Sequence, residues 1–85
     1  MEKAVLRAEN AGVIRSLLDS LTLEEQLIVG YYFGFDGGSG RTDLEISALL
    51  HIPRSTVSWK RSKAINTMRE EAERRGYQLR DFLGD

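Results

Sequence analysis

Residues 43–69 read DLEISALLHIPRSTVSWKRSKAINTMR, and this stretch decides the fold because two helical patterns meet there at a short turn. The first pattern covers 43–50, the turn is HIP at 51–53, and the second pattern covers 54–75. Pro53 has no N–H to donate and suits the start of a helix, so it marks where the second helix begins. The stretch predicts a helix-turn-helix, with a short bracing helix beside a longer one.

The longer helix begins with a concentrated positive charge. Residues 54–69 contain five Lys or Arg and no Asp or Glu, although the whole chain has a net charge of −1. Residues 1–53 carry four basic and eight acidic side chains, and residues 70–85 carry three basic and five acidic ones. Because Lys and Arg neutralise DNA phosphates, the acidic first half should face away from DNA and the basic helix toward it. A basic, polar helix face beside a bracing helix predicts binding in the DNA major groove.

The composition excludes several other classes of protein. With 85 residues and no Cys, the chain predicts one domain, residues 1–85, without disulfides or thiolate metal ligands. Its single His51 has only scattered carboxylates as co-ligands, so we expect neither a metal nor a cofactor. No His or Cys accompanies those carboxylates in a catalytic arrangement, so no enzyme activity is expected. Without an apolar run of about 20 residues or an apolar leader, a cytoplasmic protein that does not bind membranes is expected.

Helical patterns divide the predicted domain into four parts. In residues 3–18 apolar side chains recur every three to four positions, and they are Leu6, Val13, Ile14, Leu17 and Leu18. A second helix is expected at 23–33, and QLRDFL at 78–83 predicts a last short helical turn. The parts are an N-terminal helix at 1–20, a first segment and loop at 22–41, the helix-turn-helix at 42–75, and a C-terminal tail at 76–85. Because every regular segment reads as helix, the predicted fold class is all-α, with four or five helices.

Local motifs predict where the helices begin and end. Two residue pairs are spaced as capping boxes, Thr22 with Glu25 and Thr42 with Glu45. In such a box the threonine hydroxyl accepts a backbone N–H at the helix start, and the carboxylate accepts the N–H of the capping residue. Gly34 and Gly76 are expected to end the second and the long helix, because glycine accepts the left-handed geometry found there.

The expected core combines apolar positions from each helix. These positions are Leu23, Leu27, Ile28 and Tyr31; Leu44, Ala48 and Leu49, with Ile46 as a further candidate; and Val57, Ala64, Ile65 and Met68. Trp59 lies two residues beyond Val57, nearly opposite it on the helix, so we expect Trp59 to be exposed. An exposed tryptophan can pack on a thymine methyl or a sugar, or it can anchor a protein partner.

Two motifs are similar to those of a known family. LTLEEQLIVGYYFGFDGG at 21–38 resembles the first segment of region 4 of bacterial RNA polymerase sigma factors. RTDLEISALLHIPRSTVSWKRSKAINTMR at 41–69 resembles the helix-turn-helix of that region. The ending LRDFLGD at 79–85 resembles the C-terminus of the housekeeping branch, and the similarity spans about residues 14–85.

The resemblance implies a role in transcription initiation, in a bacterium or a phage that infects one. In this family the second helix of the helix-turn-helix reads the −35 promoter element, and another side of the domain binds the flap of the polymerase β subunit. The implied DNA-binding residues are Arg41, Thr42, Arg54, Ser55, Ser58, Trp59, Arg61, Ser62 and Lys63. The implied partner-binding residues are Phe33, Ile65 and Met68. Double-stranded promoter DNA and the polymerase core are the implied partners, with an anti-sigma factor or an activator as a further one.

The chain departs from the housekeeping pattern at several groove positions. They are Ser55, Ser58 and Trp59, where the pattern has Glu, Arg and Gln, and Lys60, where it has an apolar residue. Arg54 and Lys63 are retained, and Arg is the commonest bidentate reader of guanine. The chain also contains no segment resembling region 2, which opens the −10 element, so we expect a fragment of a sigma factor or a stand-alone sigma-like regulator.

Two other interpretations of the helix-turn-helix remain open. One is a stand-alone regulator or the output domain of a response regulator, although such domains usually lack the FGFDGG insertion at 33–38. The other is a sigma-like protein-interaction module that has lost DNA binding, which the low net charge and the serines at 55 and 58 favour. A gel shift at low salt distinguishes the second interpretation from a DNA-binding domain.

Overall fold

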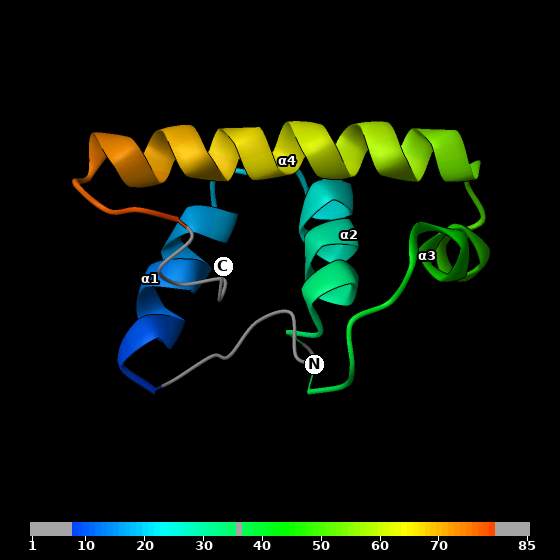
Figure 1. The fold of residues 1–85 in the computed structure, drawn as a ribbon, viewed down its shortest axis with the longest axis horizontal. Helices are drawn as coiled ribbons and strands as arrows, with labels where there is room; N and C mark the ends of the chain where they lie inside the picture. The colour runs from blue at the N-terminus through cyan, green and yellow to red at the C-terminus, as the bar shows by residue number, and fades with distance from the viewer. Residues whose placement is uncertain (1–7, 36, 80–85) are drawn as a thin grey trace.

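The computed structural model describes residues 8–35 and 37–79, which form four helices and contain no strand (Figure 1). The helices are α1 (Ala8–Leu18), α2 (Leu23–Phe33), α3 (Asp43–Leu50) and α4 (Arg54–Arg74). The predicted all-α fold with a helix-turn-helix is therefore confirmed, with α3 as the bracing helix and α4 as the long one. None of these four helices is long and apolar enough to cross a membrane.

The longest helix, α4, is the element on which the others assemble. It has 21 residues and contacts each of the other three helices. In Figure 1, α4 runs along the top of the molecule, with α1 below its C-terminal part, α2 below its middle and α3 below its N-terminal end. One side of α4 is therefore left uncovered by α1, α2 and α3.

Both predicted capping boxes are present and set the starts of α2 and α3. At the first, the Glu25 N–H donates to Thr22 Oγ1 at 3.2 Å and the Thr22 N–H donates to Glu25 Oε1 at 3.0 Å. At the second, the corresponding bonds between Thr42 and Glu45 measure 3.2 and 2.9 Å. Each box satisfies N–H groups that have no partner within the helix.

Left-handed residues end the helices where the chain turns. Gly34 follows α2 with φ +78°, and a Cβ at this position would collide with the backbone oxygen of Gly38. His51 ends α3 with φ +59°, a conformation that is uncommon for a residue with a side chain. Gly76, with φ +85°, lies two residues beyond α4, which ends at Arg74. The predicted roles of Gly34 and Gly76 as helix terminators agree with this geometry.

The core consists of a larger and a smaller cluster of buried apolar side chains. The larger cluster joins α1 and α2 to the C-terminal part of α4, and its buried members are Ile14, Leu17, Leu21, Val29, Ala64, Met68, Ala72 and Leu79. The smaller cluster, Ile28, Ile46 and Val57, joins α2 and α3 to the start of α4. The two ends of α4 therefore rest on different sets of contacts.

Several leucines that were predicted to be core residues are exposed instead. Leu23 and Leu27 are 73% and 41% exposed, and they lie on α2 opposite its buried face of Glu25, Ile28 and Val29. The capping carboxylate of Glu25 returns to the helix start and takes a place on the buried side, which leaves the two leucines outside.

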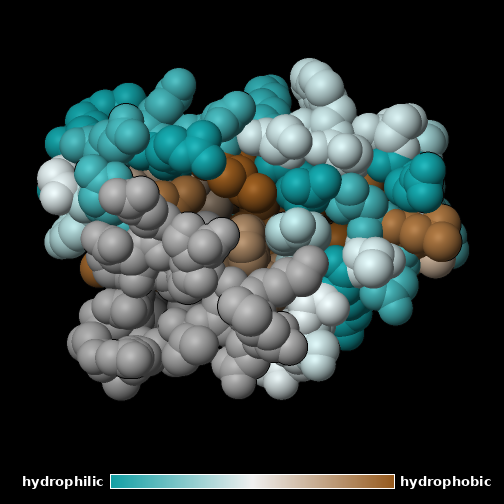
Figure 2. All heavy atoms as spheres, viewed as in Figure 1, coloured by the Kyte–Doolittle hydropathy of each residue, from teal (hydrophilic) through white to brown (hydrophobic). Residues whose placement is uncertain are grey.

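On α3 the predicted core was also wrong. Leu44 and Leu49 are 62% and 49% exposed and Ala48 is exposed, whereas Ile46 is fully buried. A helix of eight residues that contacts its neighbours along one narrow line buries few side chains. Apolar surface is accordingly visible at the end of the molecule where α3 lies (Figure 2).

Two predictions at the chain ends fall partly outside the described residues. The start predicted for the first helix at residue 3, together with Leu6, lies within residues 1–7, which are not described. In the predicted last turn at 78–83, Gln78 and Leu79 are not helical, and the remaining residues are outside the described part.

Candidate nucleic-acid interface

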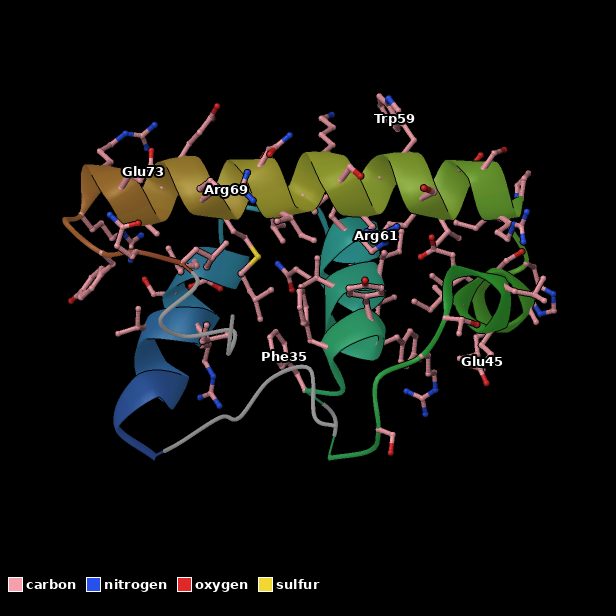
Figure 3. All side chains as sticks on the ribbon, in the orientation of Figure 1. Phe35, Glu45, Trp59, Arg61, Arg69 and Glu73 are labelled. Atoms are coloured by element: carbon pink, nitrogen blue, oxygen red, sulfur yellow. The ribbon has the colours of Figure 1, made fainter. Side chains whose placement is uncertain are left out.

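The uncovered side of α4 carries most of the residues predicted to contact DNA. Trp59 is 62% exposed and projects away from the other helices (Figure 3), whereas Val57 is fully buried beneath it. The other exposed residues of this side are Ser55, Ser62 and Lys63, and Ser58 is half-buried. Arg54 is exposed at the N-terminal end of the helix. In the space-filling view the surface along α4 is polar (Figure 2). The predicted exposure of Trp59 is confirmed, and the helix presents a continuous polar face.

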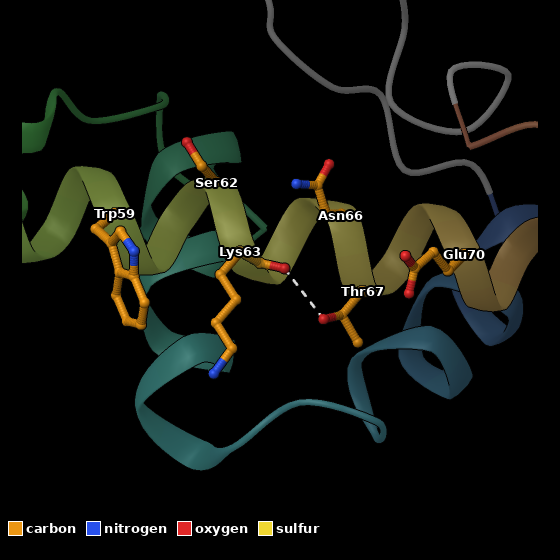
Figure 4. Close-up of a pocket in the computed structure, with 6 residues that line it drawn as sticks. All are labelled: Trp59, Ser62, Lys63, Asn66, Thr67 and Glu70. Atoms are coloured by element: carbon orange, nitrogen blue, oxygen red, sulfur yellow. Dashed lines mark hydrogen bonds between the residues drawn. The ribbon is translucent and has the colours of Figure 1, made fainter.

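A shallow groove follows this face over three turns of α4. Its lining residues are Trp59, Ser62, Lys63, Asn66, Thr67 and Glu70 (Figure 4). The ammonium of Lys63 lies 5.4 Å from the centroid of the Trp59 ring, a cation–π distance that couples the two side chains. The hydroxyl of Thr67 donates to the Lys63 carbonyl at 3.1 Å. The sequence prediction missed Asn66, Thr67 and Glu70, which lie three, four and seven residues beyond Lys63 and therefore on the same side of the helix.

A second hollow lies where the N-termini of α3 and α4 meet. It is lined by Thr42, Asp43, Leu44, Arg54, Ser55 and Ser58. Pro53 precedes α4 and makes no side-chain cap, so the first amides of α4 receive no side-chain acceptor there. Uncapped N–H groups at the positive end of a helix are suited to bind a phosphate. Three of the predicted groove residues, Arg54, Ser55 and Ser58, therefore border one concave surface together with Thr42, the capping residue of α3.

Two of the five basic residues in 54–69 point inward rather than toward this surface. Lys60 forms an ion pair with Glu24 of α2. Arg61 donates from Nε to Asp43 Oδ1 at 2.9 Å and from Nη2 to Asp43 Oδ2 at 2.8 Å. Figure 3 shows Arg61 on the side of α4 that faces α2 and α3, away from Trp59. The positive charge that faces outward is therefore smaller than the sequence suggested.

The environment of Arg61 favours the charged form of its side chain. Its guanidinium carbon lies 4.5 Å from the centroid of the Tyr32 ring. The hydrogen bonds to Asp43 raise the pKa of Arg61, partial burial opposes this, and the charges of Asp43 and Tyr32 raise it further. Arg61 was predicted to bind DNA, yet the structure places its donors in contacts between helices.

The residues that precede α3 are also engaged within the domain. The Arg41 N–H donates to the Tyr31 carbonyl at 3.0 Å, and its guanidinium carbon lies 4.9 Å from the Tyr31 ring centroid. The hydroxyl of Thr42 accepts from Glu45 in the capping box. Both residues remain near the second hollow, where their backbone positions depend on these contacts.

The predicted partner-binding residues separate into two that reach the surface and one that does not. Phe33 and Ile65 are half-buried against the larger cluster. Phe33 contacts Tyr32 edge to face at 5.0 Å and stacks with Phe35 at 5.6 Å between ring centroids. Met68 is fully buried, so it supports the core and offers no surface to a partner. Phe35 was not predicted, and its half-buried ring extends the apolar side formed by Phe33.

A helix-turn-helix with a polar, partly basic outer face defines the molecule as a DNA-binding domain of the kind found in transcription factors. The family model described as sigma-70, region 4 matches residues 17–70, which include α2, α3 and most of α4. The match covers more than half of the chain, and the protein belongs to this family. No solved structure matches the chain significantly. Membership makes it a domain of transcription initiation, in a family that interacts with DNA and with RNA polymerase.

Proposed function

We propose that this domain binds a −35-type promoter element through α4 and the β-flap of RNA polymerase through an apolar side that includes Phe33 and Ile65. The observation that carries the DNA part is the placement of Trp59 and Lys63 on the one side of α4 that no other described helix covers, with Arg54 exposed at the N-terminal end of the same helix. A helix that keeps such a face free can enter the major groove while its opposite face holds the domain together.

The charges along α4 support contact through its first half. Arg54 and Lys63 are exposed and form no ion pair with any residue of the described part of the chain. Further along, Glu70 and Glu73 are exposed, and their carboxylates would repel phosphates. The DNA footprint therefore extends from the uncapped start of α4 to about Asn66.

The side chains in this footprint suggest how bases are read. Arg54 can donate two hydrogen bonds to a guanine, and the Trp59 ring can pack on a thymine methyl. Ser55 and Ser58 are small, and hydroxyls pair with several base edges. The housekeeping-like ending and the retained Arg54 and Lys63 support a −35-type target, whereas the two serines and Trp59 predict a base preference different from that of housekeeping factors.

The polymerase contact rests on the half-buried aromatic side. Phe33, Phe35 and Ile65 border the larger cluster while keeping part of their surface accessible. An amphipathic helix placed in such a site gains affinity from a few apolar anchors. An anti-sigma factor or an activator that competes for this side, or for the acidic end of α4, would be a regulator of the same domain.

The single tryptophan provides the experiment that tests this proposal. Duplexes with a randomised −35 region are selected against the 85-residue chain at low salt, and Trp59 emission is then followed during titration with the preferred duplex. We expect a change in emission and in its quenching by iodide, because binding covers the indole. A separate titration with the isolated β-flap segment should leave Trp59 unchanged while shifting the NMR signals of Phe33 and Ile65.

The second candidate function, a protein-interaction module without DNA binding, is favoured by one observation. Lys60 and Arg61 are held in internal ion pairs, so few cations remain for DNA in a chain whose net charge is −1. If no duplex is enriched and Trp59 emission is insensitive to DNA at low salt, this second function holds. The protein would then bind the flap but not DNA.

A further inference from the structure

We propose that Arg61 of α4 is a positioning residue that, through Asp43 and Tyr32, fixes the orientation of α3 against α4 and does not contact DNA. Only the test by DNA binding rests on the proposed function. The role of Arg61 in holding the shape of the helix-turn-helix has a separate test that requires no DNA.

The contacts of Arg61 join three helices at one point. Asp43 is the first residue of α3, Arg61 lies two turns into α4, and Tyr32 belongs to the end of α2. The two nitrogens of Arg61 bond the two oxygens of Asp43 at 2.9 and 2.8 Å, so the pair is bidentate. The Tyr32 ring lies beneath the guanidinium, with its centroid 4.5 Å from Cζ. The planar guanidinium is therefore hydrogen-bonded to Asp43 along one edge and packed on the Tyr32 ring with one face, which gives it a defined orientation.

The apolar contacts of α3 lie at its middle and its C-terminal end. Ile46 is the one buried residue among those of α3, and it meets Ile28 and Val57 in the smaller cluster, against which the half-buried Leu50 also packs. These contacts leave the first turn of α3 without a buried apolar side chain. The bond from Asp43 to Arg61 attaches this first turn to α4.

The same pair also removes a charge conflict from the DNA-facing hollow. Asp43 lines that hollow together with Arg54, Ser55 and Ser58. An unpaired carboxylate there would repel a phosphate bound at the start of α4. With Arg61 bound to it, the Asp43 side chain is only 21% exposed and its charge is compensated. The clamp of Arg61, Asp43 and Tyr32 thus shapes the hollow and neutralises it.

The neighbouring ion pair provides a matched control. Lys60 and Glu24 are 31% and 40% exposed, and a lysine ammonium makes no bidentate fork. Such a pair on the surface contributes little to stability. Lys60→Ala removes a charge next to Arg61 without touching the clamp, so it separates the effect of charge from the effect of geometry.

The first test measures hydrogen exchange by NMR on the 85-residue chain without DNA. In Arg61→Ala we expect the amides of α3 to exchange about tenfold faster or more than in the parent, while amides at the C-terminal half of α4 keep their rates. Lys60→Ala should leave α3 at parent rates. Parent rates for α3 in Arg61→Ala overturn the proposal, whatever DNA binding shows.

Arg61→Lys tests the geometry and also replaces Arg61→Ala if that variant does not fold. It keeps the charge and most of the stem but loses the fork, so α3 should still exchange faster than in the parent. Full protection of α3 in Arg61→Lys would show that charge alone suffices and would reject the positioning role of the guanidinium.

The second test measures the salt dependence of binding to the preferred duplex. Removing a residue that neutralises a phosphate lowers the slope of log K against log salt by about 0.9. We expect that change for Lys63→Ala, whereas Arg61→Ala should lose affinity by about tenfold with an unchanged slope. A slope lowered in Arg61→Ala as in Lys63→Ala makes Arg61 a phosphate contact and overturns the proposal. If the parent binds no duplex, the proposed DNA function fails, and hydrogen exchange alone decides the clamp.

Discussion

Val57 and Trp59, two residues apart on α4, leave the helix on opposite sides: Val57 is fully buried between α2 and α3, and Trp59 is 62% exposed. Val57 therefore holds the helices together, whereas Trp59 is free to make the proposed contact with DNA. Single substitutions can test the two side chains separately.

Trp59→Ala should weaken DNA binding while leaving the free energy of unfolding within about 0.5 kcal/mol of the parent, as is usual for exposed positions. Val57→Ala should instead destabilise the domain, because burying a side chain of this size contributes roughly 1.5–3 kcal/mol. Urea unfolding and duplex titration of both variants provide the measurement. A large loss of stability in Trp59→Ala would show that its indole packs in the core.

Arg54→Ala should lower affinity for the preferred duplex by about 1–3 kcal/mol and relax its sequence preference, because an arginine at the start of α4 can read a guanine. The outward cations of the proposed footprint, which ends at about Asn66, are Arg54 and Lys63. With about 0.9 per phosphate contact, log K should fall with log salt at a slope of about −2. Titrations at several salt concentrations test this value, and a slope near zero would contradict groove binding.

Thr42→Ala should lower the free energy of unfolding by roughly 0.5–2 kcal/mol, because the capping bond to the Glu45 N–H is lost. Thr42→Ser keeps a hydroxyl and is the matched control, so its melting curve should stay close to that of the parent. Thermal unfolding without DNA measures both variants. An unchanged melting temperature in Thr42→Ala would show that the cap contributes nothing to stability.

Gly30 within α2 and Gly34 directly after it should respond to alanine in opposite directions. Gly30→Ala should stabilise the domain by up to about 1 kcal/mol, because Gly30 lies inside the helix and a Cβ there meets open space. Gly34→Ala should destabilise it, because Gly34 has φ +78° and a Cβ would strike the Gly38 backbone oxygen. Denaturant unfolding of the two variants tests the pair, and equal effects would contradict the geometry of this turn.

Flap binding should persist at salt concentrations that abolish DNA binding, because apolar contacts are not screened by ions. Phe33→Ala should weaken binding of the isolated β-flap segment, whereas Lys63→Ala on the far side of α4 should leave it unchanged. Calorimetric or NMR titration at low and high salt gives both affinities. Flap binding that disappears with salt alongside DNA binding would remove the apolar assignment.

Local motifs were predictable from the sequence because their determinants are three to four residues apart. The two capping boxes and the turn at Gly34 depend on residues that are close together in the sequence, and all three were predicted at the right residues. The exposed side of α4 followed from the same periodicity, since Trp59 lies opposite Val57 whatever surrounds the helix. The helix-turn-helix itself was recognisable for these reasons.

Contacts between distant segments were not predictable. Arg61 pairs with Asp43 across 18 residues and Lys60 pairs with Glu24 across 36, and nothing in their local sequence shows that these cations face inward. The burial of Ile46 in place of Leu44 also depends on how α3 is oriented toward α4. These features share a cause, because the rotation of each helix about its own axis is set by its neighbours.

The division of the core into two clusters separates the two ends of α4. The C-terminal part contributes Ala64, Met68 and Ala72 to the larger cluster, whereas the N-terminal part contributes Val57 to the smaller one. Exposed positions such as Ser55, Trp59 and Ser62 belong to neither cluster. Evolution can therefore change the outer surface of this helix without altering the residues on which the folding of the domain depends.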